Sequence, residues 1–147
     1  MNTSDLKQLA GASFRLIENG DEELARQIID PEFVNHEAED DPEDADRQVN
    51  GPAGFLATSA WLRDAFSDLR FELRETAVDG STIMAASVMT GTHTGTFQGI
   101  PPTGRAFRQQ QVHILTTAGN RITSHRAVRD DLGLLLQLGW RPSPARA

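Results

Sequence analysis

Apolar residues near the start of the chain recur at the spacing of one helix face. They fall at intervals of three and four: Leu6, Leu9, Ala10, Phe14 and Ile17. This pattern predicts an amphipathic helix over residues 4–18, because positions i, i+3 and i+4 lie on the same side of an α-helix. Ser4 is the expected N-cap, and Asn19-Gly20 is the expected end.

Three further helices are predicted, two of them in the first half of the chain. Asp21 would begin a short one, followed by an extended stretch over residues 32–38. A proline in the first turn favours another helix over 52–67. The last, over 130–139, is apolar on nearly every side, so another surface must cover it, and a second subunit is one candidate.

Between the third and the last helix the hydrophobic period changes from helical spacing to two. Residues 69–74 alternate apolar and charged side chains, which is typical of a strand. Asp79-Gly80 is a hairpin signal, and strands are expected on either side of it and again over 105–117 and 121–128. These segments predict a four-stranded antiparallel meander.

This order of elements predicts an α+β fold. Helices come first, the sheet follows, and one helix closes the chain. We expect a cone-shaped, curved antiparallel sheet wrapped around the N-terminal helices, with an internal pocket. The 147 residues contain no internal repeat and suit a single domain over residues 1–147.

Composition narrows the range of partners. The formal net charge of −7 argues against nucleic acid or an anionic membrane surface. Seven carboxylates lie within residues 37–46, and the simplest interpretation is a solvated loop. The chain has no cysteine, which fits a cytoplasmic protein and excludes thiolate metal ligands. We expect no signal peptide and no membrane span.

Candidate chemistry comes from a few titratable and amide side chains. No two of the four histidines are spaced as zinc ligands on a helix, so no metal site is expected. Asp130 and Asp131 lie where the last strand meets the last helix; one would cap the helix, and the other could face the pocket as an acid/base. Gln111 and His113 share one strand face, but the register decides whether that face is inside.

Three stretches together resemble a known family. They are GTHTGTFQGIPPTGR at 91–105, a strand carrying VHI, and RITSHRAVRDDLGLLLQLG at 121–139. They resemble the SnoaL-like polyketide cyclases, also called ester cyclases, of the nuclear-transport-factor-2-like superfamily. The resemblance implies the α+β cone with a deep pocket, and subunits that associate through the sheet. It also implies that GIPPTGR at 99–105 is a stiff crossover between sheet strands at the pocket rim, and that His93 is the last strand residue before it.

The resemblance further implies a site. Asp130 would be the acid/base of an intramolecular aldol closure, with Asp131 as the helix cap. His36, Gln111 and His113 would support it. Further candidates for binding the substrate are His93, Trp61 and Arg126. The implied ligand is small, apolar or aromatic and polyketide-like, and no cofactor is implied.

One segment departs from the family pattern. The family commonly has Glu-His-Trp where this chain has Ser124-His125-Arg126. An inward Arg126 would lower the pKa of Asp130, or would pair with an anionic substrate group or an enolate. An outward Arg126 would be a surface charge. Two alternatives to a cyclase therefore stay open: a non-catalytic protein that binds small molecules, and a polyketide-tailoring hydroxylase or epoxide-opening enzyme.

Overall fold

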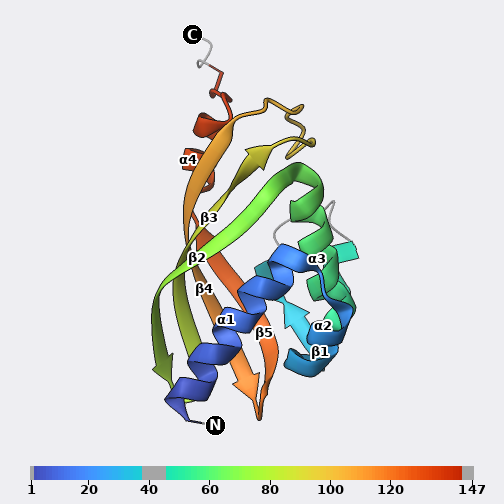
Figure 1. Ribbon diagram of the computed structural model, residues 1–147, viewed down its shortest axis with the longest axis vertical. Coiled ribbons are helices and arrows are strands. Elements are labelled where there is room, and N and C mark those ends of the chain that lie inside the picture. Colours follow the sequence, from blue (N-terminus) through green and yellow to red (C-terminus); the bar gives the residue numbers. More distant parts are fainter. Residues whose placement is uncertain (1, 38–45, 144–147) are drawn as a thin grey trace.

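The computed structural model describes residues 2–37 and 46–143, so most of the acidic run lies outside the described residues. The helices are α1 (Thr3–Asn19), α2 (Glu22–Ile28), α3 (Pro52–Ala65) and α4 (Asp131–Gln137), with a short 3-10 helix at Asp46–Gln48. The strands are β1 (Ile29–Asn35), β2 (Phe66–Asp79), β3 (Thr82–His93), β4 (Ala106–Ala118) and β5 (Arg121–Arg129). Helices α1 and α2, strand β1 and helix α3 come first, and an antiparallel meander and a last helix follow (Figure 1).

Helix α1 forms as predicted but starts earlier. Its N-cap is Asn2 instead of Ser4: the Asn2 side chain accepts a hydrogen bond from the Asp5 backbone N–H at 2.8 Å, and the Asp5 carboxylate accepts the Asn2 N–H at 3.4 Å. This reciprocal capping box satisfies two N–H groups that the helix leaves free. Gly20, with φ 66°, ends the helix in the left-handed conformation.

The sheet has five strands in the order β1-β5-β4-β3-β2, one more than the sequence predicted. The four-stranded antiparallel meander is confirmed. The stretch expected to be merely extended belongs to β1, which pairs in parallel with β5 through Val34–Ser124 and Asn35–His125. A short run with period two shows that a segment is extended, but the sequence cannot show which distant strand it will pair with.

Helix α3 ends two residues before the predicted position, and β2 starts directly at Phe66. Asp68 then takes a positive φ of 55°, and the pairing of β2 with β3 shifts between Ser67 and Arg70. Such a bulge bends a strand. The bend lets β2 begin directly after the last residue of α3. At this junction the hydrophobic pattern of the sequence fits both a helix and a strand.

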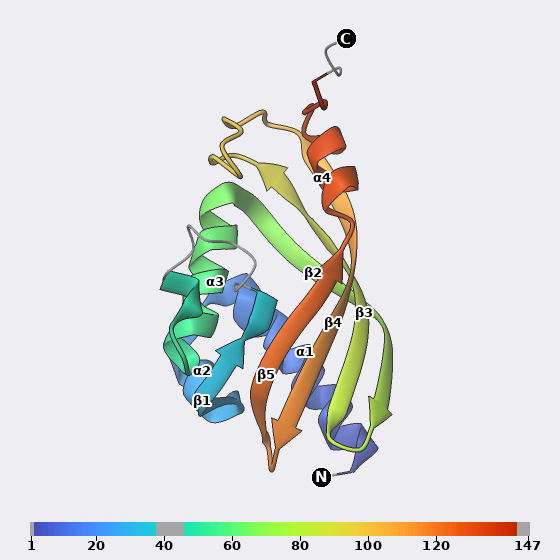
Figure 2. The same ribbon diagram turned by 180° about the vertical axis from the view of Figure 1, so that it is seen from behind.

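The helices α1 and α3 lie over one face of the curved sheet, and α4 lies at one end of the molecule (Figures 1 and 2). The main core fills the space between this face and the helices, with Phe14, Leu16 and Leu62 contributed from the helical side. Within the part of the chain that the structure describes, no helix is long and apolar enough to cross a membrane.

The register of β4 and β5 decides which polar side chains turn inward. On β4 the residues Gln109, Gln111 and His113 are buried, while the alternate positions face outward. Gln111 pairs with Arg129 of β5, and directly paired residues share a face of the sheet. Arg129 therefore also points to the inner face.

Candidate functional site

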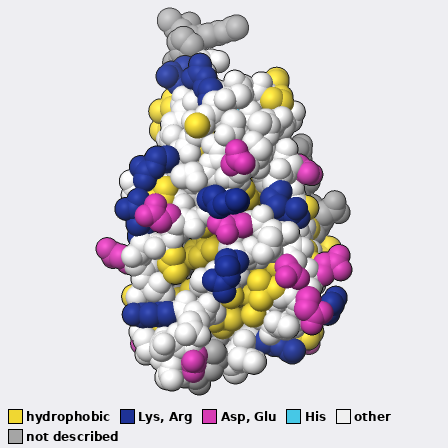
Figure 3. Space-filling model, in the orientation of Figure 1, with side chains coloured by type: hydrophobic (Ala, Val, Ile, Leu, Met, Phe, Trp, Pro, Cys, Tyr) yellow, Lys and Arg dark blue, Asp and Glu magenta, His cyan; other side chains and the backbone are white. Residues whose placement is uncertain are grey.

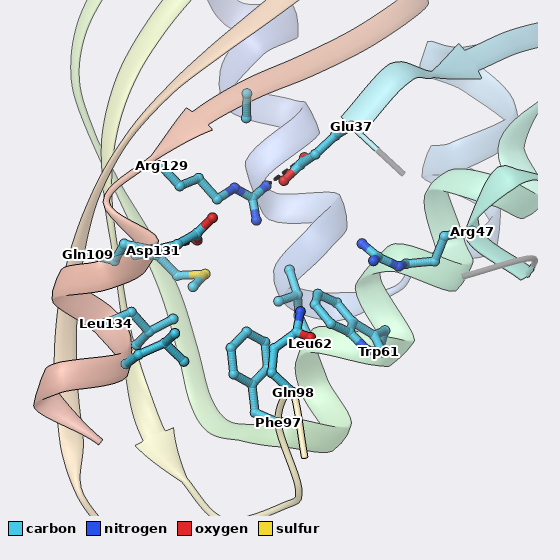
Figure 4. A pocket seen from close by; sticks show the side chains of 13 residues that line it. Glu37, Arg47, Trp61, Leu62, Phe97, Gln98, Gln109, Arg129, Asp131 and Leu134 are labelled. Carbon is cyan, nitrogen blue, oxygen red and sulfur yellow. Dashed lines mark hydrogen bonds and ion pairs between the residues drawn. The ribbon is translucent and has the colours of Figure 1, made fainter. Parts of the chain in front are cut away.

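A cavity of about 420 Å³ opens between α3, the inner face of the sheet, the loop after β3 and α4 (Figure 4). Each of these four parts contributes to the large apolar side chains of the lining, which are Trp61, Leu62, Met89, Phe97, Leu134 and Leu135. The Trp61 and Phe97 rings pack against each other with centroids 5.3 Å apart. This volume and an aromatic wall suit a small ligand with flat rings.

Asp131 brings a carboxylate to this cavity. It is the first residue of α4, and its Oδ1 accepts a hydrogen bond from Gln109 Nε2 at 3.0 Å. The same amide nitrogen donates to the Asp130 carbonyl at 3.2 Å, so Gln109 is held at the strand–helix junction. Asp131 remains exposed to solvent at the opening of the cavity.

The predicted orientation of the two aspartates is wrong. Asp130 is the N-cap of α4, where its Oδ1 accepts the Gly133 N–H at 2.9 Å. Its own N–H donates to the Gln110 carbonyl at 3.1 Å, which continues the β5–β4 ladder by one residue. The continued ladder therefore turns Asp130 outward with Val128. Asp131 is the first residue of α4, and it lies at the cavity with Arg129.

The inward cation is Arg129, and Arg126 is exposed on the outer face, opposite Ile114. The guanidinium Nη2 of Arg129 donates to the Glu37 carboxylate at 2.9 Å, and its side chain is only 9% exposed. Because Arg126 points outward, it cannot act on an acid in the pocket. A second cation, Arg47, lies over the Trp61 ring with 3.9 Å between its Cζ and the ring centroid.

Behind the cavity, a chain of hydrogen bonds runs along the sheet. It starts at Gln109, whose Oε1 accepts from Gln111 Nε2 at 2.7 Å. Gln111 Oε1 then meets His113 Nε2 at 2.6 Å, and His113 Nδ1 meets His125 Nε2 at 2.8 Å. The far end is His125 Nδ1, which lies 3.0 Å from Asn35 Oδ1. Gln111 and His113 thus connect to Asp131 through Gln109 and do not themselves line the cavity.

Burial keeps the two linked histidines neutral. Burial, together with the nearby charge of Arg129, lowers the pKa of His125 to about 3, and burial, with smaller contributions from His125 and Arg129, lowers the pKa of His113 well below its ordinary value. The 3.7 Å contact between His125 and Glu37 is therefore not an ion pair near neutral pH. Each neutral ring carries one N–H group, so the pair has two. The two rings make three contacts, to Gln111, to each other and to Asn35, and each contact needs one proton. One contact therefore lacks a proton unless the Asn35 side-chain amide is turned so that its nitrogen faces His125.

The remaining predicted residues are scattered. Trp61 does line the cavity. His93 is the last residue of β3, as expected, but it is fully buried and anchors the crossover: its Nδ1 accepts the Thr103 N–H at 3.3 Å. His36 is exposed and is not among the residues that line the cavity.

The polar residues that do line the cavity were mostly not identified from the sequence. They are Glu37, Arg47, Gln98, Gln109, Arg129 and Asp131. A signal for two of them was present: Gln109 shares the alternation of Gln111 and His113, and Arg129 shares that of His125. Glu37 and Arg47 carry no such signal, because they flank a long connection. Among the described residues, no group of three His, Asp or Glu side chains could hold a metal ion.

Comparison with known proteins shows the family of this chain. The model of the SnoaL-like polyketide cyclase family matches residues 7–138. Aklanonic acid methyl ester cyclase DauD of Streptomyces sp. (strain C5) is 34% identical over 129 residues, which cover 77% of this chain and 76% of that protein. Nogalonic acid methyl ester cyclase of Streptomyces nogalater is 32% identical over 127 residues, covering 79% of this chain and 90% of that protein.

Among solved structures, TsrD from Streptomyces laurentii superposes with a TM-score of 0.81. It is 24% identical, and the match covers 95% of this chain and 98% of that one, so it shows the shared fold. The chain belongs to the SnoaL-like polyketide cyclase family. Its fold is the α+β cone of the nuclear-transport-factor-2-like superfamily.

Proposed function

We propose that this protein closes a ring in a polyketide methyl ester by an intramolecular aldol reaction, with Asp131 as the acid/base. The observation that carries the proposal is the Asp131 carboxylate, which Gln109 holds at a cavity walled by Trp61 and Phe97. Two relatives named as methyl ester cyclases support the substrate class. The role expected for Asp130 passes to Asp131, because Asp130 faces the outer side of the sheet.

The proposed reaction is an isomerisation that needs no external co-reactant. The Asp131 carboxylate takes a proton from the carbon next to a carbonyl, and the electron pair moves onto that carbonyl oxygen. The enolate carbon then attacks a second carbonyl, which forms the new C–C bond. The alkoxide receives the proton from the Asp131 carboxylic acid, and the enzyme returns to its starting state.

The test is direct ring closure of aklanonic acid methyl ester and nogalonic acid methyl ester. Product is separated by liquid chromatography and identified by NMR, because the isomerisation leaves the mass unchanged. Asp131→Asn keeps size and hydrogen bonding but removes the exchangeable proton, and we expect turnover to fall by roughly 10²- to 10⁴-fold.

The matched control is Asp130→Asn. Asparagine caps a helix about as well as aspartate, so this variant should keep its turnover and its melting temperature. Equal losses in both variants, or a loss confined to Asp130→Asn, would show that the assignment to Asp131 is wrong. Tight binding of either ester by the wild-type protein with no conversion would favour the non-catalytic binding protein.

Two further parts of the proposal concern the setting of the reaction. We propose a homodimer or a higher oligomer, supported by apolar side chains exposed on the outer sheet face, among them Met84, Val112 and Val128. We also propose that the protein works in the cytoplasm without a metal or organic cofactor; the cysteine-free sequence fits a reducing compartment.

A further inference from the structure

The cavity contains a buried cation that the acid/base chemistry described above does not use. Arg129 extends from the end of β5 into the cavity, and Figure 4 shows its guanidinium on the same side as the Asp131 carboxylate. The side chain is nine-tenths buried, and the residue carries five N–H donors.

Most of these donors have no acceptor among the residues that the structure describes. The single hydrogen bond that Arg129 makes to described residues goes to Glu37, at 2.9 Å. Its Nε is buried without any acceptor in the described part of the chain. A buried donor without a partner is costly, and a catalytic role is one reason for a native structure to keep one. The guanidinium is therefore held in place by one carboxylate, with hydrogen-bonding capacity left over.

The surroundings favour an oxygen atom as the missing partner. Across the cavity are the rings of Trp61 and Phe97, so a flat ligand bound against them would lie between these rings and the β5 side. Asp131 and Arg129 line the cavity on that side. A carboxylate that removes a proton and a cation beside it are the two groups that enolate formation needs, because the negative charge moves from the acid/base to the carbonyl oxygen.

We propose that Arg129 binds the substrate oxygen that becomes negatively charged when Asp131 removes the proton, and that Glu37 positions the guanidinium for this task. This rests on the proposed ring closure and names the group that stabilises its intermediate. The ligand class is a flat, fused-ring phenol or ketone whose oxygen carries negative charge in the bound or reacting state. Arg129 thus takes the role that the sequence suggested for an inward Arg126.

The test uses alizarin, 1,2-dihydroxyanthraquinone, as a stable probe with fused rings and a phenol. Its visible absorption changes when the phenol ionises, so the pKa of the bound dye can be read by titrating pH at saturating protein. We expect the wild-type protein to lower the dye pKa by roughly 1 to 3 units, the usual effect of an opposite charge at contact distance. Arg129→Gln should abolish this lowering, and Arg129→Lys should retain part of it.

Two controls separate charge from structure. Arg126→Gln removes a cation from the outer face and should leave the dye pKa as in the wild type. The double change Glu37→Gln with Arg129→Gln removes both members of the ion pair, so it avoids an uncompensated buried carboxylate if Arg129→Gln alone folds poorly. The double variant should bind the dye with the dye pKa not lowered.

The proposal is overturned if the wild-type protein fails to bind alizarin or fails to lower its pKa, or if the lowering survives in the double variant. Turnover measurements distinguish a failure of the Arg129 proposal from a failure of the proposed ring closure. Where an ester is converted, Arg129→Lys should reduce kcat by about 10²-fold with little change in KM, as loss of an oxyanion donor does. Ring closure that is indifferent to Arg129 refutes only the oxyanion role. An Arg129-dependent dye shift without ring closure of any ester refutes only the cyclase proposal.

Discussion

Nearby residues with the same side chain face opposite sides of this molecule. Asp130 and Asp131 have the same side chain, yet one closes the first turn of α4 from outside and the other lines the cavity. Arg126 and Arg129 differ in the same way. Side-chain chemistry alone therefore does not identify a functional residue here.

The Asp130 cap makes a prediction about stability. Asp130→Ala removes the acceptor for the Gly133 N–H, so the free energy of unfolding should fall by about 1 kcal/mol, the usual worth of an N-cap. Urea denaturation measures this change. Asp130→Asn should stay within about 0.5 kcal/mol of the wild type, because asparagine caps a helix about as well as aspartate. An unchanged stability in Asp130→Ala would show that the cap contributes nothing.

The buried histidine pair makes a prediction about pH. The pKa of His125 is about 3 in the folded protein and near 6.5 when unfolded, so below pH 6.5 the unfolded chain binds more protons. Stability should therefore decrease as pH falls from 6.5 to 5, by up to about 1.4 kcal/mol per pH unit for each buried histidine. The measurement is the free energy of unfolding in urea at several pH values in this interval.

Two variants separate the contribution of the buried histidines to this pH dependence from that of other titrating groups. Substituting His125→Gln should reduce the pH dependence whatever it does to absolute stability, because one buried imidazole is gone. His36→Gln changes an exposed histidine and should leave the slope as it is in the wild type. A wild-type stability that stays constant from pH 6.5 to pH 5 would contradict the neutral buried pair.

At the scale of elements, the loop between β3 and β4 connects the sheet to α3. Its Thr94 and Gly95 N–H groups both donate to the Ala65 carbonyl at the end of α3, at 3.1 and 2.9 Å. The loop then contributes Phe97 and Gln98 to the cavity. The first part of this loop is thus a wall of the site, whereas the Gly-Pro-rich part after it, residues 99–105, is held to His93 through Thr103.

The close approach at Gly95 can be tested. An added Cβ there would lie 1.9 Å from the Asp64 carbonyl oxygen, which belongs to the backbone and cannot move aside cheaply. Gly95→Ala should destabilise the protein by roughly 1–3 kcal/mol, as overpacking does, and should weaken ligand binding by displacing Phe97. Thermal unfolding and dye binding report the two effects.

Gly11→Ala is the matched control for that variant. Its Cβ would meet only the end of the flexible Arg15 side chain, at an ordinary 3.5 Å, within α1. Alanine is a better helix former than glycine, so this variant should gain up to about 1 kcal/mol. Equal behaviour of the two alanine variants would show that the loop is not tightly packed on α3.

At the scale of the whole molecule, the two faces of the sheet differ. The inner face is covered by α1 and α3, whereas no helix among the described residues covers the outer face of β3, β4 and β5 (Figures 1 and 2). On the side that carries α1, Figure 3 shows basic and acidic side chains interspersed, with apolar surface between them. That side presents no single basic stripe of the kind that binds nucleic acid.

The uncovered face leads to a prediction of association. Val112 and Val128 pair across β4 and β5 and are 40% and 69% exposed, and Met84 on β3 is 49% exposed. We expect this face to bind a second copy, so light scattering at micromolar concentration should give at least twice the mass of the chain. Val128→Glu should shift the protein to monomer. A wild-type monomer under these conditions would contradict the prediction.

The control places the same charge elsewhere. Val49, in the connection before α3, is 50% exposed and lies outside the sheet, so Val49→Glu should leave the mass unchanged. Dissociation in both variants would point to a general loss of stability instead of an interface on the outer face.

By itself, the sequence determined the helices, the four-stranded meander, the crossover after His93 and the family. Each of these depends on local periodicity, turn residues or a contiguous motif. Tertiary structure alone decided the parallel pairing of β1, the inward turn of Asp131 and Arg129, and the arrival of Glu37 and Arg47 at the cavity. The physical reason is that a shift of one residue in register exchanges the faces of a strand, and register is set by packing across the whole sheet.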